Sequence, residues 1–249
     1  MTAAKPTLIL APGLMCDATS WGGVPSGLPE FNCLVVDHGH ADSLVQMAEQ
    51  LLAGAPARFA LAGHSMGGRV ALEVMRIAPE RVTHLGLFDT GHLPKPGGEA
   101  GDEEVRKRMA LLAIARSQGV RAMASEWVKG MVAPQRLNDR PLIDAILDMF
   151  ERKDADIFEK QLHALIHRPD ATAVLQTVKV PTLVLCGALD AWSPPAQHQT
   201  IADCIPARPA MVSIPDGGHM VMQEQPEAVI AAMRQWLSLP SSVSRGATC

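Results

Sequence analysis

Six short runs of apolar residues recur along this sequence, and most of them end at a glycine, a proline or an aspartate. Because the runs are continuous rather than alternating, they are typical of strands that are covered on both faces. Helical patterns at 43–53, 66–78 and 226–237 stand between or after these runs. Such alternation predicts right-handed crossovers, a parallel sheet and an α/β fold. The runs occupy residues 7–10, 33–36, 59–62, 85–88, 182–186 and 211–214.

The alternation is interrupted after Asp89, where a long stretch shows no clear strand pattern until Thr182. This stretch opens with Pro and Gly at 94–101, and helical patterns follow at 103–117, 120–132, 141–152 and 155–167. We therefore expect a helical insertion at 92–170 that forms a lid over one end of the sheet. The core would then consist of 1–91 and 171–239, and the small, polar tail 240–249 is expected to be frayed.

The composition limits the class of protein and its partners. A chain of 249 residues that is 47% apolar can bury a large core. A net charge of −4 without a long basic run argues against nucleic acids and anionic membranes as partners. No stretch reaches the roughly 18 to 20 apolar residues of a membrane span, and 1–6 lack the apolar core of a signal peptide, so we expect a cytoplasmic protein.

The cysteine and tyrosine usage excludes several kinds of site. The five cysteines are scattered and form no CxxC pair, which fits a reducing compartment and not a disulfide framework or a Cys-rich zinc site. Tyrosine is absent, so no mechanism can use a tyrosine hydroxyl. The cysteines are Cys16, Cys33, Cys186, Cys204 and Cys249.

The first motif that carries chemistry is Gly63-His64-Ser65-Met66-Gly67, a G-x-S-x-G pattern between an apolar run and a helical pattern. In this context the pattern indicates a nucleophilic serine on a tight strand-to-helix turn. Such a turn strains the serine backbone, requires glycine on both sides and presents Oγ at the end of the sheet. The helix N-terminus there favours developing negative charge. The structural alternative is a glycine-rich turn with an incidental serine.

A serine nucleophile needs a base and an orienting acid, and both follow later apolar runs. Asp190 follows the run 182–186, and His219 follows the run 211–214. The order Ser65, Asp190, His219 is the one expected on a sheet of this kind. Taken singly, Asp190 could cap a helix and His219 could be a solvated loop histidine, but the three together favour a catalytic triad.

Several further ionisable residues compete with this assignment. Asp89 ends the run 85–88 and is a second candidate for the acid, whereas Asp216 lies too near His219 in the same loop to orient it. His38 and His40 form an H-x-H pattern, and His64 and His92 are candidates for the site edge. No H-E-x-x-H motif or cysteine cluster accompanies them, so we expect no metal and no cofactor. His64 is expected to pack rather than to react.

With these motifs the sequence resembles the α/β-hydrolase fold family over about 7–239. The resemblance depends on Gly-His-Ser-Met-Gly-Gly at 63–68, Gly-Ala-Leu-Asp at 187–190 and Gly-Gly-His at 217–219. It implies a mostly parallel sheet with flanking helices and a helical cap formed by the insertion. Only six residues precede the first apolar run. The two N-terminal strands usual in the family then have no sequence to form them, and about six strands are expected.

The resemblance also implies an oxyanion hole formed by two backbone N–H groups. One belongs to Met66, which follows the nucleophile, and the other to the loop after the first strand, where Leu14 is assigned. The family often has His-Gly in that loop, whereas Ala11 and Pro12 precede Gly13 here.

The predicted insertion is rich in Met and long aliphatic residues. Soft Met side chains suit an apolar pocket, and Trp127 and Met131, four residues apart, are our candidates for pocket walls. The alternative is that these side chains form only the apolar faces of the cap helices.

The expected function is a cofactor-free serine hydrolase that acts on small carboxylic esters or lactones through an acyl-enzyme. Bacterial esterases and enol-lactone hydrolases of the family are the relatives it resembles. One competing function is a C–C bond hydrolase of an aromatic ring-cleavage pathway, where a Trp commonly follows the histidine that Met220 follows here. An amidase, an acyltransferase and a non-catalytic ligand receptor also stay open. The expected partner is a small-molecule substrate, and a homodimer is left open.

Overall fold

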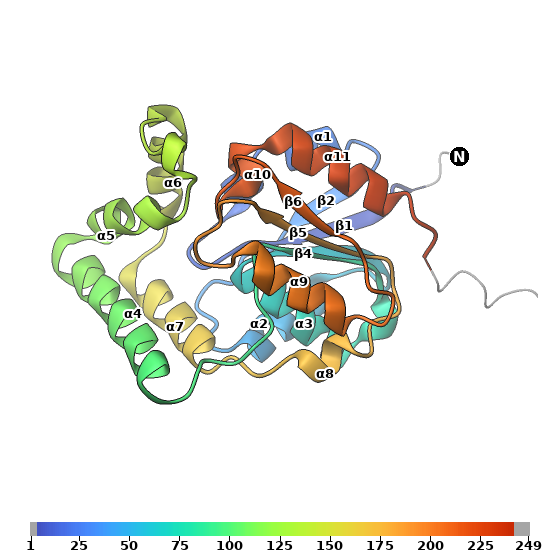
Figure 1. The fold of residues 1–249 in the computed structure, drawn as a ribbon, viewed down its shortest axis with the longest axis horizontal. Helices are drawn as coiled ribbons and strands as arrows, with labels where there is room; N and C mark the ends of the chain where they lie inside the picture. Colours follow the sequence, from blue (N-terminus) through green and yellow to red (C-terminus); the bar gives the residue numbers. More distant parts are fainter. Residues whose placement is uncertain (1–3, 242–249) are drawn as a thin grey trace, which may run out of the picture.

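A six-stranded sheet forms the centre of the computed structural model, which describes residues 4–241 (Figure 1). Every neighbouring pair of strands is parallel, and the strand order is β2-β1-β3-β4-β5-β6. The predicted α/β class and the predicted strand number are therefore confirmed. The strands are β1 (Thr7–Ala11), β2 (Asn32–Val35), β3 (Phe59–His64), β4 (Val82–Phe88), β5 (Thr182–Gly187) and β6 (Met211–Ile214).

The strand order reverses between β1 and β3, because β2 pairs on one side of β1 and all later strands are added on the other side. In open α/β sheets, ligands bind outside the carboxyl ends of the strands at such a reversal. The loops that follow β1 and β3 are therefore where the topology itself places a binding site.

Helices cover both faces of the sheet (Figure 1). Side chains of successive strand residues point to opposite faces, so Ile9 and Leu61 pack with α2 and α3, while Leu8 and Leu10 pack with α1 and α11. Ser43 caps α2 by accepting a hydrogen bond from the Gln46 N–H at 3.2 Å. One face carries α2 (Leu44–Gly54), α3 (Met66–Ile77), α8 (Thr172–Leu175) and α9 (Pro195–Cys204), and the other carries α1 (Val24–Gly27), α10 (Val221–Glu224) and α11 (Pro226–Leu237).

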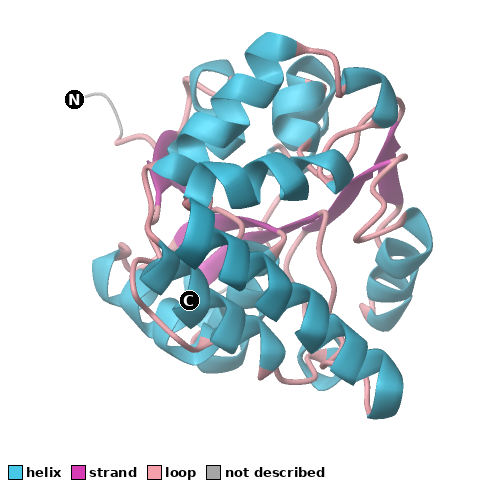
Figure 2. Cartoon of the chain, turned by 90° about the vertical axis from the view of Figure 1, so that its left-hand side faces the viewer, coloured by secondary structure: helices cyan, strands magenta, loops and turns pink. Residues whose placement is uncertain are grey.

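A group of helices between β4 and β5 lies at the carboxyl end of the sheet, at the left of Figure 1 and facing the viewer in Figure 2. It consists of α4 (Gly98–Gln118), α5 (Val120–Trp127), α6 (Arg140–Glu151) and α7 (Ala155–Ile166). The boundaries of this insertion at 92–170 stay a prediction. The short 3-10 turns are η1 (Ala18–Trp21), η2 (Pro79–Arg81), η3 (Val128–Gly130) and η4 (Pro134–Arg136).

Two expected element boundaries are wrong. Helix α4 begins at Gly98, inside the stretch 94–101 that was expected to be a linker, and Glu99 in its first turn suits the positive end of the helix dipole. The helix expected over 120–132 ends at Trp127 and continues as η3, which contains the poor helix former Gly130. Nearly all of the tail 240–249 lies outside the described residues.

Polar contacts join the insertion to the loops after β1 and β2. Arg152 Nε lies 2.7 Å from Asp17 Oδ2, and Lys153 Nζ lies 2.8 Å from Asp37 Oδ1. The buried Gln161 accepts a hydrogen bond from the Met15 N–H at 2.8 Å. The insertion thus holds the loop after β1, which borders the candidate site. None of the described helices combines the length and the apolar character needed to cross a membrane.

Candidate active site

Ser65, at the end of β3, occupies a strained strand-to-helix turn. Its φ of 53° lies in the left-handed region that side-chain-bearing residues rarely adopt, which costs on the order of 1–3 kcal/mol. A Cβ on Gly63 would overlap the Gly67 carbonyl, and one on Gly67 would overlap the Ala11 carbonyl, so both positions require glycine. The Thr90 hydroxyl donates to the Ser65 carbonyl at 2.6 Å and helps to hold the turn.

A chain of hydrogen bonds links the three residues that the sequence suggests as a triad. Ser65 Oγ lies 2.9 Å from His219 Nε2, and His219 Nδ1 lies 2.8 Å from Asp190 Oδ2. An ionised carboxylate only accepts, so Nδ1 carries the proton of the neutral imidazole and Nε2 accepts from the serine hydroxyl. The other oxygen of Asp190 accepts the N–H groups of Trp192 at 2.8 Å and Ser193 at 3.0 Å.

The surroundings of Asp190 keep its carboxylate ionised. Burial by itself raises the pKa, but the positive character of His219 and the hydrogen bonds from His219, Ser193 and Trp192 outweigh burial and lower the pKa of Asp190 to about 2. Asp190 is therefore ionised at neutral pH, which suits a group that orients an imidazole and stabilises its charged form.

Asp89, the other candidate for the acid, lies beside Asp190 but has a different partner. Its Oδ1 accepts the Gly187 N–H at 2.9 Å. Burial, and then the negative charge of Asp190, raise the pKa of Asp89 well above its usual range. Its Oδ2 accepts no hydrogen bond from the described residues, and a proton there lets Asp89 donate toward Asp190 as a neutral acid.

The loop that carries His219 is fixed from two sides. The His64 ring donates from Nε2 to the His219 carbonyl at 2.8 Å, and its centroid lies 5.0 Å from the His219 ring. Burial, and then the nearby His219, lower the pKa of His64 to about 3, so the His64 ring is neutral. On the other side, the buried Glu224 carboxylate accepts the N–H groups of Gly218 at 3.0 Å and Met220 at 3.2 Å.

Two backbone N–H groups near Ser65 are free to bind an oxyanion. The described residues offer no hydrogen-bond partner to the N–H groups of Leu14 and Met66, and both residues line the same cavity as Ser65. A Cβ on Gly13 would lie 3.3 Å from Ser65 Cβ, so this loop passes directly beside the serine. His38 Nε2 donates to the Pro12 carbonyl at 3.1 Å and supports the loop from below.

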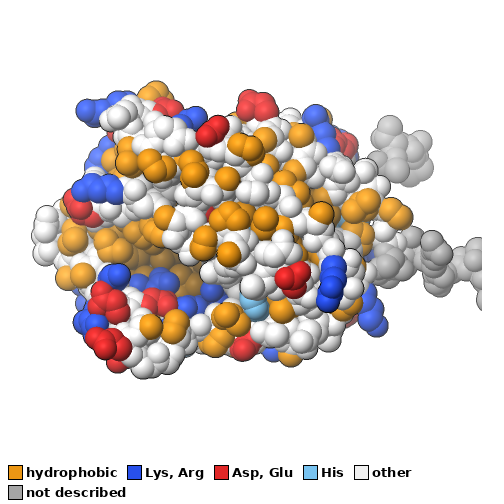
Figure 3. Space-filling view, viewed as in Figure 1, with side chains coloured by type: hydrophobic (Ala, Val, Ile, Leu, Met, Phe, Trp, Pro, Cys, Tyr) orange, Lys and Arg blue, Asp and Glu red, His pale blue; other side chains and the backbone are white. Residues whose placement is uncertain are grey.

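A cavity of about 1010 Å³ opens above Ser65, between the sheet and the insertion. Figure 3 shows it as the hollow at the left of the molecule, with apolar side chains along its back. Trp127 and Met131 both line it. Trp192, which the sequence did not suggest, lies between the Trp127 ring at 5.4 Å and the His219 ring at 4.9 Å. Its position two residues after Asp190 is the one signal by which the sequence could have indicated it.

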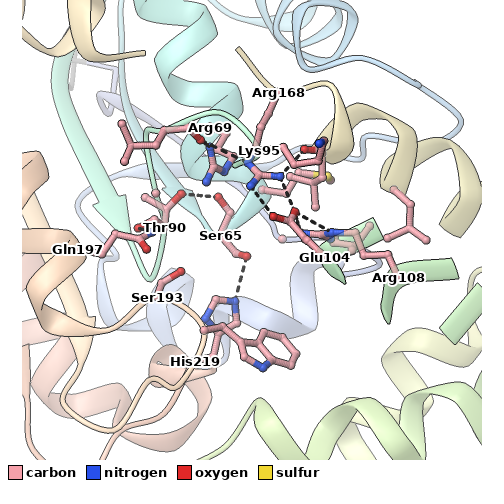
Figure 4. Close-up of a pocket in the computed structure, with 18 of the residues that line it drawn as sticks. Ser65, Arg69, Thr90, Lys95, Glu104, Arg108, Arg168, Ser193, Gln197 and His219 are labelled. Atoms are coloured by element: carbon pink, nitrogen blue, oxygen red, sulfur yellow. Dashed lines mark hydrogen bonds and ion pairs between the residues drawn. The ribbon is translucent and has the colours of Figure 1, made fainter. Parts of the chain in front are cut away.

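The opposite side of the cavity is polar (Figure 4). Arg69 comes from α3, one helical turn after Ser65, and Arg168 and Arg108 flank the Glu104 carboxylate. The sequence did not suggest these residues either, although Arg69 follows directly on the glycine-rich motif. The charged side chains that line the cavity are Arg69, Lys95, Glu104, Lys107, Arg108, Arg168 and Asp170.

The remaining reactive or metal-ligating residues play a smaller part. Asp89, Asp190 and His219 place ligand atoms within 4.8 Å of one another, and no other described residues form such a group. Metal binding there would have to displace the proton on His219 Nδ1, which the Asp190 hydrogen bond holds in place. Cys16 lines the cavity, but burial raises the pKa of its thiol to about 12, so it is a poor nucleophile.

The comparisons with known proteins agree with this architecture. A model of the alpha/beta hydrolase family matches residues 8–232. A provisionally named esterase/lipase of Haemophilus influenzae is 27% identical, over 95% of this chain and 85% of its own. A thermophilic esterase from Thermogutta terrifontis superimposes with a TM-score of 0.82 at 29% identity, covering 93% of this chain and 89% of its own. The enol-lactonase from Burkholderia xenovorans LB400 shares the fold, with a TM-score of 0.81 at 21% identity, covering 95% and 93% of the two chains.

Proposed function

Because this chain belongs to the α/β hydrolase family and is similar to hydrolases along most of its length, we propose that it is a serine hydrolase of small carboxylic esters or lactones. The observation that carries the proposal is the unbroken hydrogen-bond chain from Ser65 through His219 to Asp190 at the floor of the cavity. A serine hydroxyl becomes a useful nucleophile when a neutral imidazole accepts its proton and a carboxylate orients that imidazole.

In the proposed reaction, Ser65 Oγ attacks the substrate carbonyl as its proton passes to His219 Nε2. The ionised Asp190 stabilises the imidazolium that forms. The N–H groups of Leu14 and Met66 bind the oxyanion, and each such donor is worth about 3 kcal/mol of transition-state stabilisation in comparable sites. His219 then protonates the leaving alcohol, and water attacks the acyl-enzyme with His219 as the base. No step requires a metal or a cofactor.

The relatives support esters and lactones as the substrate class. Two of the similar proteins are named as esterases, and a third, which shares the fold, is named as an enol-lactonase. The apolar wall around Trp127 and Met131 offers space for the acyl or alcohol part of such a substrate. Amides and vinylogous diketones are the competing substrates, because fold and triad alone do not choose the bond that is cleaved.

A fluorophosphonate probe and a panel of esters, lactones, amides and vinylogous diketones test the proposal. Wild-type protein should be labelled and should hydrolyse an ester or lactone fastest, with EDTA leaving the rate unchanged. Ser65→Ala should lose the label and about 10³- to 10⁶-fold in kcat while keeping its melting temperature. Absence of both labelling and activity would contradict the proposal and favour the non-catalytic receptor, and an active Ser65→Ala variant would refute the serine mechanism.

A further inference from the structure

The cavity above Ser65 is basic, although the whole chain is acidic. The chain carries a net charge of −4, yet five Lys and Arg side chains line the cavity against two carboxylates. One carboxylate, Asp170, accepts the Thr172 N–H at 2.7 Å and forms no ion pair with the other charged residues of the cavity. An excess of cations in a concave, partly dehydrated site raises the local concentration of anionic ligands.

The other carboxylate, Glu104, forms ion pairs with two of the three arginines that line the cavity. Arg168 donates from Nη1 and Nη2 to the two oxygens of Glu104 at 2.6 and 2.9 Å. Arg108 Nη2 lies 3.0 Å from the same Glu104 and its Nε 3.1 Å. A bidentate pair of this kind is rigid, so the Glu104 cluster forms a fixed cationic wall rather than a set of mobile side chains.

Arg69 is the one arginine of the cavity that Glu104 does not pair with. No carboxylate within residues 4–241 forms an ion pair with it, and its hydrogen bond goes to the Leu93 carbonyl, 2.8 Å from Nη1. Gly91 leaves room for the guanidinium, because a Cβ there would lie 2.7 Å from Arg69 Nη2. Burial, and then the charges of Arg168 and Arg108, lower the pKa of Arg69 to about 9, so the group stays charged at neutral pH.

The guanidinium of Arg69 lies near Ser65, the proposed nucleophile. Ser65 directly precedes α3 and Arg69 lies in the first turn of that helix, and both residues line the same cavity. Figure 4 shows the guanidinium of Arg69 close above Ser65. A ligand carbonyl held at Ser65 can therefore reach Arg69 through a short spacer of a few bonds.

We propose that Arg69 binds a free carboxylate of the substrate, so that the preferred substrates are esters or lactones that carry a second, ionised carboxyl group. This inference depends on the proposed hydrolase function and names its substrate class. The planar guanidinium matches one carboxylate in a bidentate geometry, and the neighbouring arginines are already paired with Glu104. The apolar wall at Trp127 and Met131 then accommodates the rest of the molecule.

Two substrates that differ only in the charge of one end test whether the enzyme prefers a free carboxylate. Mono-4-nitrophenyl adipate carries the carboxylate, and 4-nitrophenyl 5-carbamoylpentanoate is its neutral isostere. Wild-type kcat/KM should be about 10-fold or more higher for the adipate ester, mainly through a lower KM. Arg69→Gln should reduce this ratio at least about 10-fold, and Arg69→Lys should restore part of it.

Arg106→Gln is the control for general electrostatics. Arg106 is an exposed residue of α4 that pairs with Glu103 and does not line the cavity. This variant removes the same charge and should keep the wild-type ratio. Free adipate should inhibit the hydrolysis of 4-nitrophenyl acetate competitively, and inorganic phosphate should inhibit much less. Stronger inhibition by phosphate than by adipate would contradict the assignment of a carboxylate.

The outcomes separate the two proposals. If 4-nitrophenyl acetate is hydrolysed and Ser65 is labelled, but the adipate ester is no better than its isostere or Arg69→Gln leaves the ratio unchanged, the carboxylate proposal is wrong and the hydrolase proposal stands. If neither acetate hydrolysis nor labelling occurs, the proposed function itself has failed. If Arg106→Gln changes the kcat/KM ratio of the adipate ester to its isostere as much as Arg69→Gln does, the overall positive charge of this region, and not Arg69 itself, selects the anionic substrate.

Discussion

Asp89 and Asp190 show how two neighbouring aspartates acquire different protonation states in one site. Both follow strands of the sheet, and both are buried. Asp190 accepts hydrogen bonds from His219 and from two backbone N–H groups, whereas Asp89 accepts one from Gly187 and faces the charge of Asp190. Since like charges at short distance cannot both be stabilised in a buried site, the aspartate with fewer donors takes up the proton.

The first prediction ranks the two aspartates by their effect on activity. Asp190→Asn should lower kcat about 10⁴-fold, because an amide that donates to Nδ1 holds the wrong tautomer of His219. Asp89→Asn should cost less than about 10-fold, because an amide is neutral like the protonated acid and its oxygen can still accept from the Gly187 N–H. Steady-state kinetics of both variants on one ester checks the ranking. The reverse order would move the acid to Asp89.

The second prediction concerns stability against pH. In the folded protein the pKa of Asp89 is raised above its ordinary value of 3.8 by burial and by Asp190, so the folded state keeps a proton that the unfolded chain releases. Stability from this group is present below that ordinary value and is lost as pH rises toward the folded pKa, at about 1.4 kcal/mol per pH unit. Asp89→Asn has no such loss, and asparagine tolerates the φ of 43° at this position.

Urea unfolding of both proteins between pH 4 and pH 8 measures this effect. The free energy of unfolding of Asp89→Asn should rise relative to wild type as the pH increases, until the folded-state pKa of Asp89 is passed. A difference that stays constant with pH would show that Asp89 is ionised in the native protein.

The residues with fixed local patterns were predictable from the sequence, and those without such patterns were not. Ser65 is flanked by glycines that its backbone requires, and Asp190 and His219 each follow a strand. Trp192 and Arg69 carry no comparable pattern, since an arginine on a helix and a tryptophan after an aspartate are equally compatible with an exposed surface. Only the packing of the insertion against the sheet gives them a place at the cavity.

At the scale of elements, the short helix α10 connects the histidine loop to the insertion. The Glu224 carboxylate at its end accepts the N–H groups of Gly218 and Met220 with one oxygen, and the Ala133 N–H at 2.7 Å with the other. Ala133 belongs to the segment between η3 and η4, far from Glu224 in the sequence. A four-residue helix has no period by which it could be predicted, so this link was not visible in the sequence.

The third prediction tests this link. Glu224→Gln keeps one acceptor oxygen and replaces the other with an amide group that cannot accept. Either the Ala133 N–H or the N–H groups of Gly218 and Met220 then lose their acceptor. We expect a loss of about 1–3 kcal/mol in the free energy of unfolding and a lower kcat, because the position of His219 loosens. Denaturant unfolding and kinetics on the same ester measure both. Glu227→Gln, an exposed position on α11, is the matched control and should change neither.

At the scale of the whole molecule, the cavity is formed where the insertion covers the reversal point of the strand order. The sequence predicted the sheet, the helical insertion and the strand ends that carry Ser65, Asp190 and His219, because each depends on local periodicity and on simple rules of connection. The charged side of the cavity was not predictable. Its residues come from α3, from the loop before α4, from α4 itself and from the residues after α7. Their proximity depends on how the insertion is placed in three dimensions.

The fourth prediction concerns the apolar wall. Trp127 lies between Phe150 at 5.4 Å and Trp192 at 5.4 Å, and removing it should enlarge the cavity. Trp127→Ala should shift the ratio of kcat/KM between two acyl chain lengths about 10-fold toward the longer chain, since one methylene of fit is worth about 1–3 kcal/mol. A short activated ester needs little from this wall and should lose much less rate.

The melting temperature separates specificity from stability in this experiment. Leu137→Ala, at an exposed position of the insertion that does not line the cavity, should leave the chain-length ratio as in wild type. If Trp127→Ala lowers both rates equally and also lowers the melting temperature, Trp127 stabilises the insertion and does not determine substrate choice.

The order of the elements along the chain also determines when a newly made polypeptide has a complete candidate site. Synthesis delivers β1 to β4 first, and with them the strained serine turn and both N–H groups near it, whereas the acid and the base arrive only with β5 and β6, after the whole insertion. Synthesis proceeds from the N-terminus, so an unfinished nascent chain holds the proposed nucleophile Ser65 before His219, the proposed base, has been made. For the proposed hydrolase, reactivity toward esters is therefore acquired only in the final stage of folding, once β6 has docked.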